Sequence, residues 1–205
     1  DDAGFNSFFK TGWKRFYLTW YGKDLASAEA LCPQTVKLLR GIPSIKAAMF
    51  ASLPPGATLV RHRDPYAGSL RYHLGLQTPN DPGCYIEVDG QRYHWHDGEA
   101  VMFDETYIHH AANTTNQPRV ILFCDVERPL WGSPLRWFNR FFAKHVMAAA
   151  STQNVAGEPI GGVNKVFAQG YKLRAMAKEF KRGNRTGYYV GKWLMIGALV
   201  WAIFW

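Results

Sequence analysis

Between Ala47 and Val126 the chain consists of short apolar runs separated by turn signals. Each run is too short for an average helix and contains β-branched or aromatic side chains, which favour strands. Several short strands with turns roughly every 8–12 residues are typical of a double-sheet jelly roll or a barrel. The clearest turns are Pro54-Pro55-Gly56, Asn80-Asp81-Pro82-Gly83 and Asp89-Gly90, and the clearest strand-like runs are Tyr85 to Val88, Ala100 to Phe103 and Val120 to Val126.

Helical patterns flank this strand-rich region. Before it, an irregular aromatic run leads to a predicted helix that Ser27 can cap and that Gly41-Ile42-Pro43 ends. After it, Pro134 to Met147 carries apolar residues at helical spacing, with basic residues at every fourth position, and such a helix can lie on a membrane. A second candidate helix spans Lys165 to Lys181. We therefore expect a lead-in that packs on the core at 1–48, the strand-rich core at 49–128, a basic amphipathic helical region at 129–187 and a hydrophobic membrane segment at 188–205.

The formal charge of +8 is concentrated towards the C-terminus. Residues 1–126 contain 12 Lys/Arg and 13 Asp/Glu, whereas residues 127–205 contain 12 and 3. A basic block can bind nucleic acid or an anionic membrane, or can form a solvated face. Because Trp and Phe are interspersed with these basic residues, we expect a membrane surface and no nucleic acid.

The segment 188–205 contains a single charged residue, Lys192. Crossing the hydrocarbon core takes about 20 apolar residues, so this segment is short for a full span. The lysine can snorkel, and the flanking aromatic residues suit the membrane interface. We expect membrane attachment rather than a buried helix of a soluble protein, with the preceding basic side cytoplasmic. Because the chain opens at Asp1 rather than at a methionine, we also expect it to be a fragment.

A candidate metal centre is spread over two parts of the core. His62 and Asp64 form a His-x-Asp step, whose two side chains point to the same face of a strand, and His109 follows on a neighbouring strand. Two histidines and one carboxylate form the facial triad of non-haem iron(II) oxygenases, which leaves positions for 2-oxoglutarate and dioxygen. The His-x-Asp step alone is weak evidence, because such tripeptides also occur in turns.

Three further polar residues can hold the cosubstrate near this centre. Arg119 lies ten residues after His109, and on the adjacent strand its guanidinium can form a bidentate pair with the distal carboxylate of 2-oxoglutarate. Arg71 and His73 share a strand face and can add polar contacts to the same anion. Read alone, Arg119 also fits a surface strand arginine, and His73 also fits a hydrogen-bonded core histidine.

Other residues with metal-ligand chemistry are not assigned to a site. His94 and His96 share a strand face but have no third ligand nearby in the sequence, so we expect them at the surface. His110 points away from His109 if this segment is extended. The three cysteines are scattered without a CxxC spacing, which argues against a disulfide framework and a structural zinc site and favours a reducing compartment.

Several spaced motifs resemble the aspartyl/asparaginyl beta-hydroxylase domain. In order along the chain they are Pro54-Pro55-Gly56, Arg71-Tyr72-His73-Leu74-Gly75-Leu76, the step from Trp95 to Gly98, Phe103-Asp104-Glu105-Thr106 with His109, and Arg119. The resemblance implies that His62 and His109 bind iron and that Arg71, His73 and Arg119 contact 2-oxoglutarate. It also implies a mainly β fold, with a double-stranded β-helix (cupin-like jelly-roll) core, an N-terminal helix and C-terminal amphipathic and hydrophobic helices.

One position departs from the mammalian peptide-modifying members, which carry glycine in place of Asp64 and use two histidines. The carboxylate, the stretch from His62 to His73, the opening Asp2 to Lys10 and the hydrophobic end resemble the bacterial lipid A 2-hydroxylases, over nearly the whole chain. That resemblance implies an iron(II)- and 2-oxoglutarate-dependent dioxygenase that hydroxylates C2 of a secondary acyl chain of lipid A, at the cytoplasmic face of the bacterial inner membrane.

Three alternative functions remain open on the sequence alone. A soluble aspartyl/asparaginyl hydroxylase of peptides explains the core but leaves the basic tail without a purpose. A binding or structural double-sheet domain needs no metal. A nucleic-acid oxygenase can use the basic tail on phosphates, but the Trp and Phe residues of the predicted helices disfavour it.

Overall fold

The computed structural model describes residues 8–162, 164, 176–190 and 192–193, and the chain divides into two compact units, Asp1–Asn164 and Lys165–Trp205. In the second unit, residues 176–183 and 185–190 are helical. Most of the predicted helix Lys165 to Lys181 and most of the hydrophobic segment 188–205 lie outside the described residues. Within the described part of the chain, no helix combines the length and apolar character needed to cross a membrane.

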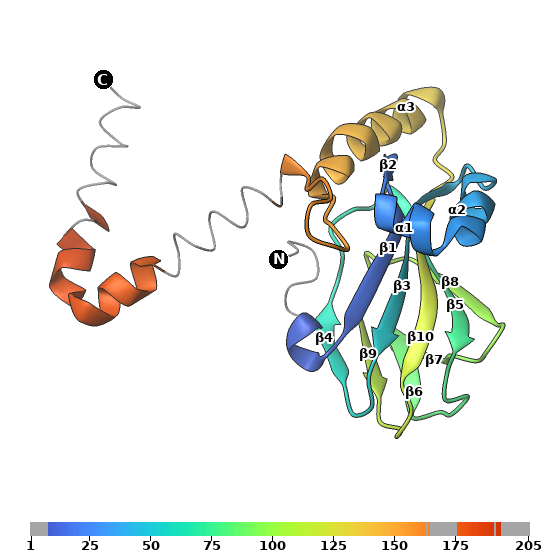
Figure 1. Cartoon of the computed structure of the whole chain (residues 1–205), viewed down its shortest axis with the longest axis horizontal. Helices are drawn as coiled ribbons and strands as arrows, with labels where there is room; N and C mark the ends of the chain where they lie inside the picture. Colours follow the sequence, from blue (N-terminus) through green and yellow to red (C-terminus); the bar gives the residue numbers. More distant parts are fainter. Residues whose placement is uncertain (1–7, 163, 165–175, 191, 194–205) are drawn as a thin grey trace. The chain divides into compact units, whose positions relative to one another are not determined.

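The first unit is built on two antiparallel sheets that face each other (Figure 1). The larger sheet has the strand order β2-β1-β3-β10-β5-β8, and the smaller has the order β4-β9-β6-β7. This is the jelly-roll type of fold that the sequence predicted. The strands are β1 (Lys14–Trp20), β2 (Lys23–Asp24), β3 (Ile45–Leu53), β4 (Thr58–His62), β5 (Ser69–Gln77), β6 (Cys84–Val88), β7 (Gln91–His94), β8 (Ala100–Phe103), β9 (His109–Asn113) and β10 (Arg119–Glu127).

The three strand-like runs named from the sequence are confirmed as β6, β8 and β10. The predicted turn Asp89-Gly90 joins β6 to β7, and its two residues have φ angles of 47° and 79°. Two successive positive φ angles are typical of the type I′ turn, whose twist matches that of the strands it connects. Local chemistry alone therefore determines this hairpin.

The aromatic lead-in is more regular than the sequence suggested. After a 3-10 turn, η1 (Phe8–Thr11), the strand β1 pairs with β3, so the expectation of an irregular run was wrong here. The register between β1 and β3 shifts between Tyr17 and Thr19, and both Tyr17 and Leu18 are buried. A bulge of this kind breaks the two-residue alternation by which a strand is recognised.

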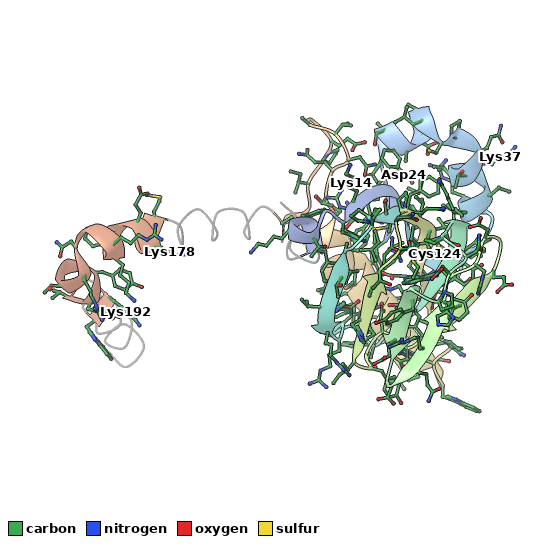
Figure 2. The ribbon with its side chains drawn as sticks, turned by 90° about the horizontal axis from the view of Figure 1, so that it is seen from below. Lys14, Asp24, Lys37, Cys124, Lys178 and Lys192 are labelled. Carbon is green, nitrogen blue, oxygen red and sulfur yellow. The ribbon has the colours of Figure 1, made fainter. Side chains whose placement is uncertain are left out.

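Two short helices replace the single N-terminal helix that the sequence predicted. They are α1 (Ala26–Leu31) and α2 (Pro33–Arg40), and Leu25, not Ser27, occupies the first N-cap position. Pro33 causes the break, because a proline disfavours the helical conformation of the residue before it. The predicted end at Gly41 is confirmed. Figure 2 shows Lys37 of α2 at the outer edge of the unit, whereas Cys124 of β10 is fully buried.

The amphipathic helix predicted from Pro134 to Met147 is confirmed. It consists of α3 (Ser133–Phe142), a wider π-helical turn η2 (Ala143–Met147) and a 3-10 turn η3 (Ala148–Ala150). The indole nitrogen of Trp20 donates a hydrogen bond to the carbonyl of Met147 over 2.8 Å. This contact ties the end of the helical segment to β1.

Candidate metal centre

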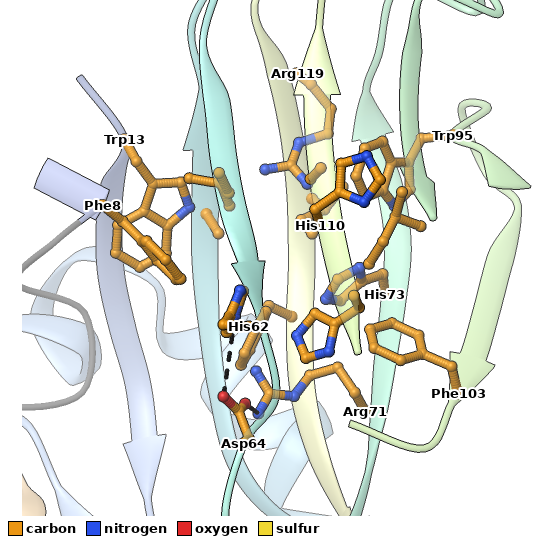
Figure 3. Close-up of a pocket in the computed structure, with 17 residues that line it drawn as sticks. Phe8, Trp13, His62, Asp64, Arg71, His73, Trp95, Phe103, His110 and Arg119 are labelled. Carbon is orange, nitrogen blue, oxygen red and sulfur yellow. Dashed lines mark hydrogen bonds and ion pairs between the residues drawn. The ribbon is translucent and has the colours of Figure 1, made fainter. Parts of the chain in front are cut away.

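The smaller sheet brings the two histidines of the predicted triad together. His62 ends β4 and His109 begins β9, and the two residues are direct partners in the strand register. Asp64 lies two residues beyond β4, where its backbone N–H donates to the carbonyl of Glu105 over 2.9 Å. One ligand atom from each of His62, Asp64 and His109 lies within 4.8 Å of the other two. Figure 3 shows His62 and Asp64 pointing toward each other at one end of the pocket. The three side chains therefore surround a common point.

Both imidazole rings are oriented by a backbone carbonyl. Nδ1 of His62 lies 2.7 Å from the carbonyl oxygen of Val60, and Nδ1 of His109 lies 2.9 Å from that of Tyr107. A ring that donates from Nδ1 presents the lone pair of Nε2, which is the arrangement of histidines that bind metals. Burial, together with the neighbouring His62, lowers the pKa of His109 and so favours the neutral ring that a metal ligand requires.

The donor set fits a divalent transition metal. Two neutral imidazoles and one carboxylate on one side of an ion leave the opposite side open for further ligands. The geometry of His62, Asp64 and His109 therefore matches the requirements of a facial triad, although the assignment of these residues as ligands stays a proposal.

Arg71 of β5 pairs with three carboxylates. Its Nη2 donates to Oδ2 of Asp64 over 2.8 Å and also contacts Glu105, while its Nε lies 3.1 Å from Oδ1 of Asp125. Burial would lower the pKa of this arginine, but the three carboxylates raise it above its ordinary value. The guanidinium is thus permanently charged and is held directly behind Asp64.

Two of these carboxylates are buried and have hydroxyl donors of their own. Ser69 donates to Oε1 of Glu105 over 2.6 Å, and the phenol of Tyr21 donates to Oδ2 of Asp125 over 2.8 Å. Burial raises the pKa of Glu105 to about 7 and also raises that of Asp125. The hydrogen bonds offset part of the cost of removing these groups from water.

Arg119 is in a very different environment. Its side chain is on the inward face of β10, is 2% exposed, and stacks over the ring of Trp95 with 4.3 Å between the guanidinium carbon and the ring centroid. Within the described residues it forms no ion pair with a carboxylate. Burial lowers the pKa of Arg119 to about 10, so the group remains charged at neutral pH. A buried charge without a counter-ion is costly, and an anion that enters the pocket would relieve that cost.

His73 lies between Arg119 and the metal centre (Figure 3). Both of its ring nitrogens are buried without a hydrogen-bond partner among the described residues, and its ring stacks on Phe123 at 5.1 Å. Burial, followed by the charges of Arg119 and Arg71, holds the pKa of His73 well below its usual range. The neutral ring therefore has one N–H donor and one acceptor to offer to a ligand.

Comparison with known proteins identifies the family. Residues 2–129 match the family model described as aspartyl/asparaginyl beta-hydroxylase. The chain belongs to this hydroxylase family. It is 44% identical over 131 residues to the ornithine lipid ester-linked acyl 2-hydroxylase of Rhizobium tropici, a match that covers 63% of this chain and 46% of that protein. It is 31% identical over 126 residues to human aspartate beta-hydroxylase domain-containing protein 2, covering 57% and 34%.

The chain thus spans less than half the length of these relatives. Among solved structures it is similar to the Cupin_2 domain of an XRE family transcriptional regulator from Enterobacter cloacae, with a TM-score of 0.40, 13% identity, and coverage of 57% of this chain and 97% of that chain.

One placement in the structure differs from the prediction. Arg119 was expected on the strand next to His109, but β10 belongs to the larger sheet, whereas β9 belongs to the smaller sheet. The loop between them, residues 114–118, crosses from one sheet to the other. The arginine therefore approaches the pocket from the side opposite the two histidines. His73 and Arg71 lie on the inward face of β5, as predicted from their spacing.

Sequence reasoning missed the supporting residues of the site. Glu105, Asp125 and Tyr21 had been given no role, although the two carboxylates pair with Arg71 and Tyr21 donates to Asp125. A signal existed for Asp125, because it is the only charged residue in the run from Val120 to Val126. It also lies an even number of positions from Arg119, so the two side chains are expected on the same face of the strand. Phe8 was also missed, and its ring packs edge-on against His62 at 4.9 Å.

The remaining histidines are placed as follows. His94 pairs with Tyr85 in the hairpin of β6 and β7, and both His94 and His96, which were expected at the surface, are half-buried. His110 lies with Nδ1 3.8 Å from Oε1 of Glu87. None of these three joins His62, Asp64 and His109 in the group that could hold a metal ion, which is the one such group within the described residues. Cys32, Cys84 and Cys124 are free.

Proposed function

We propose that this hydroxylase uses iron(II), 2-oxoglutarate and dioxygen to hydroxylate C2 of an acyl chain in a membrane lipid, with a secondary acyl chain of lipid A as the substrate. The observation that carries the cosubstrate assignment is the buried guanidinium of Arg119, which has no carboxylate partner among the described residues and lies in the same pocket as the triad. A dicarboxylate satisfies both ends of such a pocket, because one end can bind a metal while the other pairs with the arginine.

In this proposal each protein residue has a limited task. His62, Asp64 and His109 hold the iron, and Arg119 binds the distal carboxylate over the face of Trp95. His73 and Arg71 complete the cosubstrate pocket, the former through its unpaired ring nitrogens. Bound iron supplies the oxygen activation, by which one atom of dioxygen enters a C–H bond while 2-oxoglutarate becomes succinate and carbon dioxide.

The lining of the pocket supports an alkyl substrate. Apart from His110 and the polar residues named above, the walls are apolar or aromatic, and they include Phe8, Trp13, Leu59, Phe103 and Ile121. Such walls exclude water and make favourable contacts with methylene groups. The similarity to a relative whose name describes acyl 2-hydroxylation supports the same class of reaction. The basic, aromatic region after residue 128 supports a site at the cytoplasmic face of the bacterial inner membrane.

Two other substrates have support from the comparisons. The 44% identity to the Rhizobium tropici enzyme favours an ornithine lipid. The family description and the human relative favour an aspartyl or asparaginyl side chain of a peptide. Hydroxylation of any of the three candidate substrates would use the same triad and Arg119, so the identity of the substrate has to be tested directly.

Mass spectrometry of lipids from cells with and without the protein tests the proposal. We expect lipid A to gain one oxygen atom at C2 of a secondary acyl chain only in cells that produce the protein, and not in cells that produce the Arg119→Ala variant. A gain confined to ornithine lipids would replace lipid A by the second candidate. Oxygen gain in neither lipid, with succinate release by the purified protein on peptides, would overturn acyl hydroxylation.

A further inference from the structure

The outward side of α3 presents large aromatic side chains to solvent. Trp137, Phe138 and Phe141 are 67%, 58% and 48% exposed, and Trp131, just before the helix, is 92% exposed. Trp137 and Phe141 stack on each other with 5.6 Å between ring centroids. A helix of a globular protein ordinarily turns such residues towards the core, and a contiguous exposed apolar face marks an interaction site.

A row of basic residues runs beside this aromatic face. Arg136, Arg140 and Lys144 are spaced four apart, so at about 100° per residue they follow one side of the helix. All three are exposed, and Arg140 also pairs with Glu127 over 2.9 Å. The sequence from Arg128 to Gly157 contains no acidic residue. The surface around α3 is therefore aromatic on one side and positively charged on the other.

The inner side of α3 is fixed to the catalytic unit. Asn139, which is 6% exposed, donates from Nδ2 to the carbonyl of Gly68 over 2.9 Å and accepts at Oδ1 from the phenol of Tyr66 over 2.7 Å. Phe142 stacks on Tyr66 at 5.5 Å. A Cβ atom at position 68 would collide with Oδ1 of Asn139, so a glycine is needed for this approach. These contacts prevent α3 from turning its aromatic side inwards.

We propose that Trp137, Phe138 and Phe141, together with Arg136 and Lys144, form a docking face for a bilayer surface that contains anionic lipids. The aromatic rings suit the interface between headgroups and acyl chains, and the basic row suits anionic headgroups. A second copy of this chain fits less well, because it would bring a second basic row and a second net charge of +8 against the first. This inference rests on the proposed function, because docking would place the enzyme on the membrane surface that contains the lipid substrate.

The docking face is connected to the metal centre. Tyr66 and Gly68, which hold α3, belong to the segment that directly follows Asp64. The segment continues into β5, on which Arg71 and His73 lie. Docking through α3 would therefore place the membrane against the part of the unit that carries one of the three ligands.

Local fluorescence on the full, metal-free chain tests the docking face. A polarity-sensitive dye is attached to a single introduced cysteine in a Cys32→Ser background, since Cys84 and Cys124 are fully buried. The positions are Trp137→Cys and Phe141→Cys, and the control is Leu38→Cys on α2, which is apolar and 73% exposed. With phosphatidylglycerol-containing vesicles we expect a blue shift at 137 and 141 and none at 38. Because the reading is local, membrane binding through residues 188–205 does not imitate it.

A second measurement compares affinities. The double variant Trp137→Ser, Phe141→Ser should bind these vesicles with about tenfold lower affinity. Leu38→Ser should bind them like the unmodified chain. Unshifted dyes at 137 and 141 on vesicle-bound protein would overturn the proposal. A blue shift that grows with protein concentration in the absence of vesicles would also overturn it, in favour of self-association. Failure of the proposed function appears instead as absent succinate release and leaves the dye readings unchanged.

Discussion

Arg71 holds Asp64 by a hydrogen bond of 2.8 Å from Nη2 to Oδ2, and the two residues are seven positions apart in the chain. The other carboxylate oxygen, Oδ1, lies 3.9 Å from Nε2 of His62. One oxygen is therefore held by Arg71, and the other lies on the side of His62. This division of tasks suggests that Arg71 orients the carboxylate in addition to its predicted contact with the cosubstrate.

Replacing Asp64 tests whether the carboxylate is needed. We expect Asp64→Ala to abolish turnover and to weaken binding of manganese(II), a spectroscopic substitute for iron(II), by more than about 100-fold, because one of the three proposed ligands is lost. Electron paramagnetic resonance of free manganese measures the affinity. An Asp64→Gly variant that keeps full activity would show that two histidines are sufficient.

The orienting role of Arg71 predicts an effect that depends on Asp64. Arg71→Lys keeps the charge but loses the planar fork that reaches three carboxylates, so manganese affinity should fall about 10- to 100-fold. In an Asp64→Ala background the same substitution should change the affinity little. Equal losses in both backgrounds would contradict the role, and circular dichroism of each variant checks that the fold is kept.

The buried charge of Arg119 should destabilise the ligand-free protein and strengthen the binding of the proposed cosubstrate. Arg119→Met removes a buried charge that has no carboxylate partner among the described residues. We expect the metal-free variant to be more stable by about 1 kcal/mol, since lost stacking on Trp95 offsets part of the gain. The same variant should show a KM for 2-oxoglutarate raised at least about 100-fold. Chemical denaturation and succinate release measure the two effects, and a clearly destabilised variant would contradict the first.

The ion pair of Asp104 with Arg128 predicts a loss of stability in acid. Arg128 lies 2.7 Å from Oδ1 of Asp104 and, as the main cause, lowers the pKa of that carboxyl to about 2. The unfolded value is about 4, so the contribution is complete above pH 4 and is lost as the pH falls from about 4 to about 2. We expect about 1–2 kcal/mol after allowing for solvent screening. The stability difference between the protein and Asp104→Asn, measured by urea unfolding, should shrink over this interval.

Local patterns predicted much of the fold, but not its exceptions. The hairpin at Asp89-Gly90 and the strands β6, β8 and β10 depend on turn chemistry and on side-chain types that are readable in the sequence. Strand β1 was missed because its bulge buries both Tyr17 and Leu18. The break at Pro33 was also missed, although proline is a clear local signal.

The site was predictable where residues share a short stretch. His62 with Asp64, and Arg71 with His73, lie two apart and face the same way. The partners of Arg71 were not predictable in this way, because Glu105 is 34 positions away and meets it only through tertiary packing. For the same reason the sheet to which Arg119 belongs could not be read from its distance to His109.

The two ends of the pocket belong to different sheets, since His62 and His109 come from the smaller sheet and Arg119 comes from the larger. Packed sheets are about 10 Å apart, and this distance is set by the side chains between them. A diacid that connects the two ends must match that separation. In the proposed function, the packing of pocket residues such as Ile86 and Ile121 between the two sheets would therefore set the carbon-chain length of the diacid that fits.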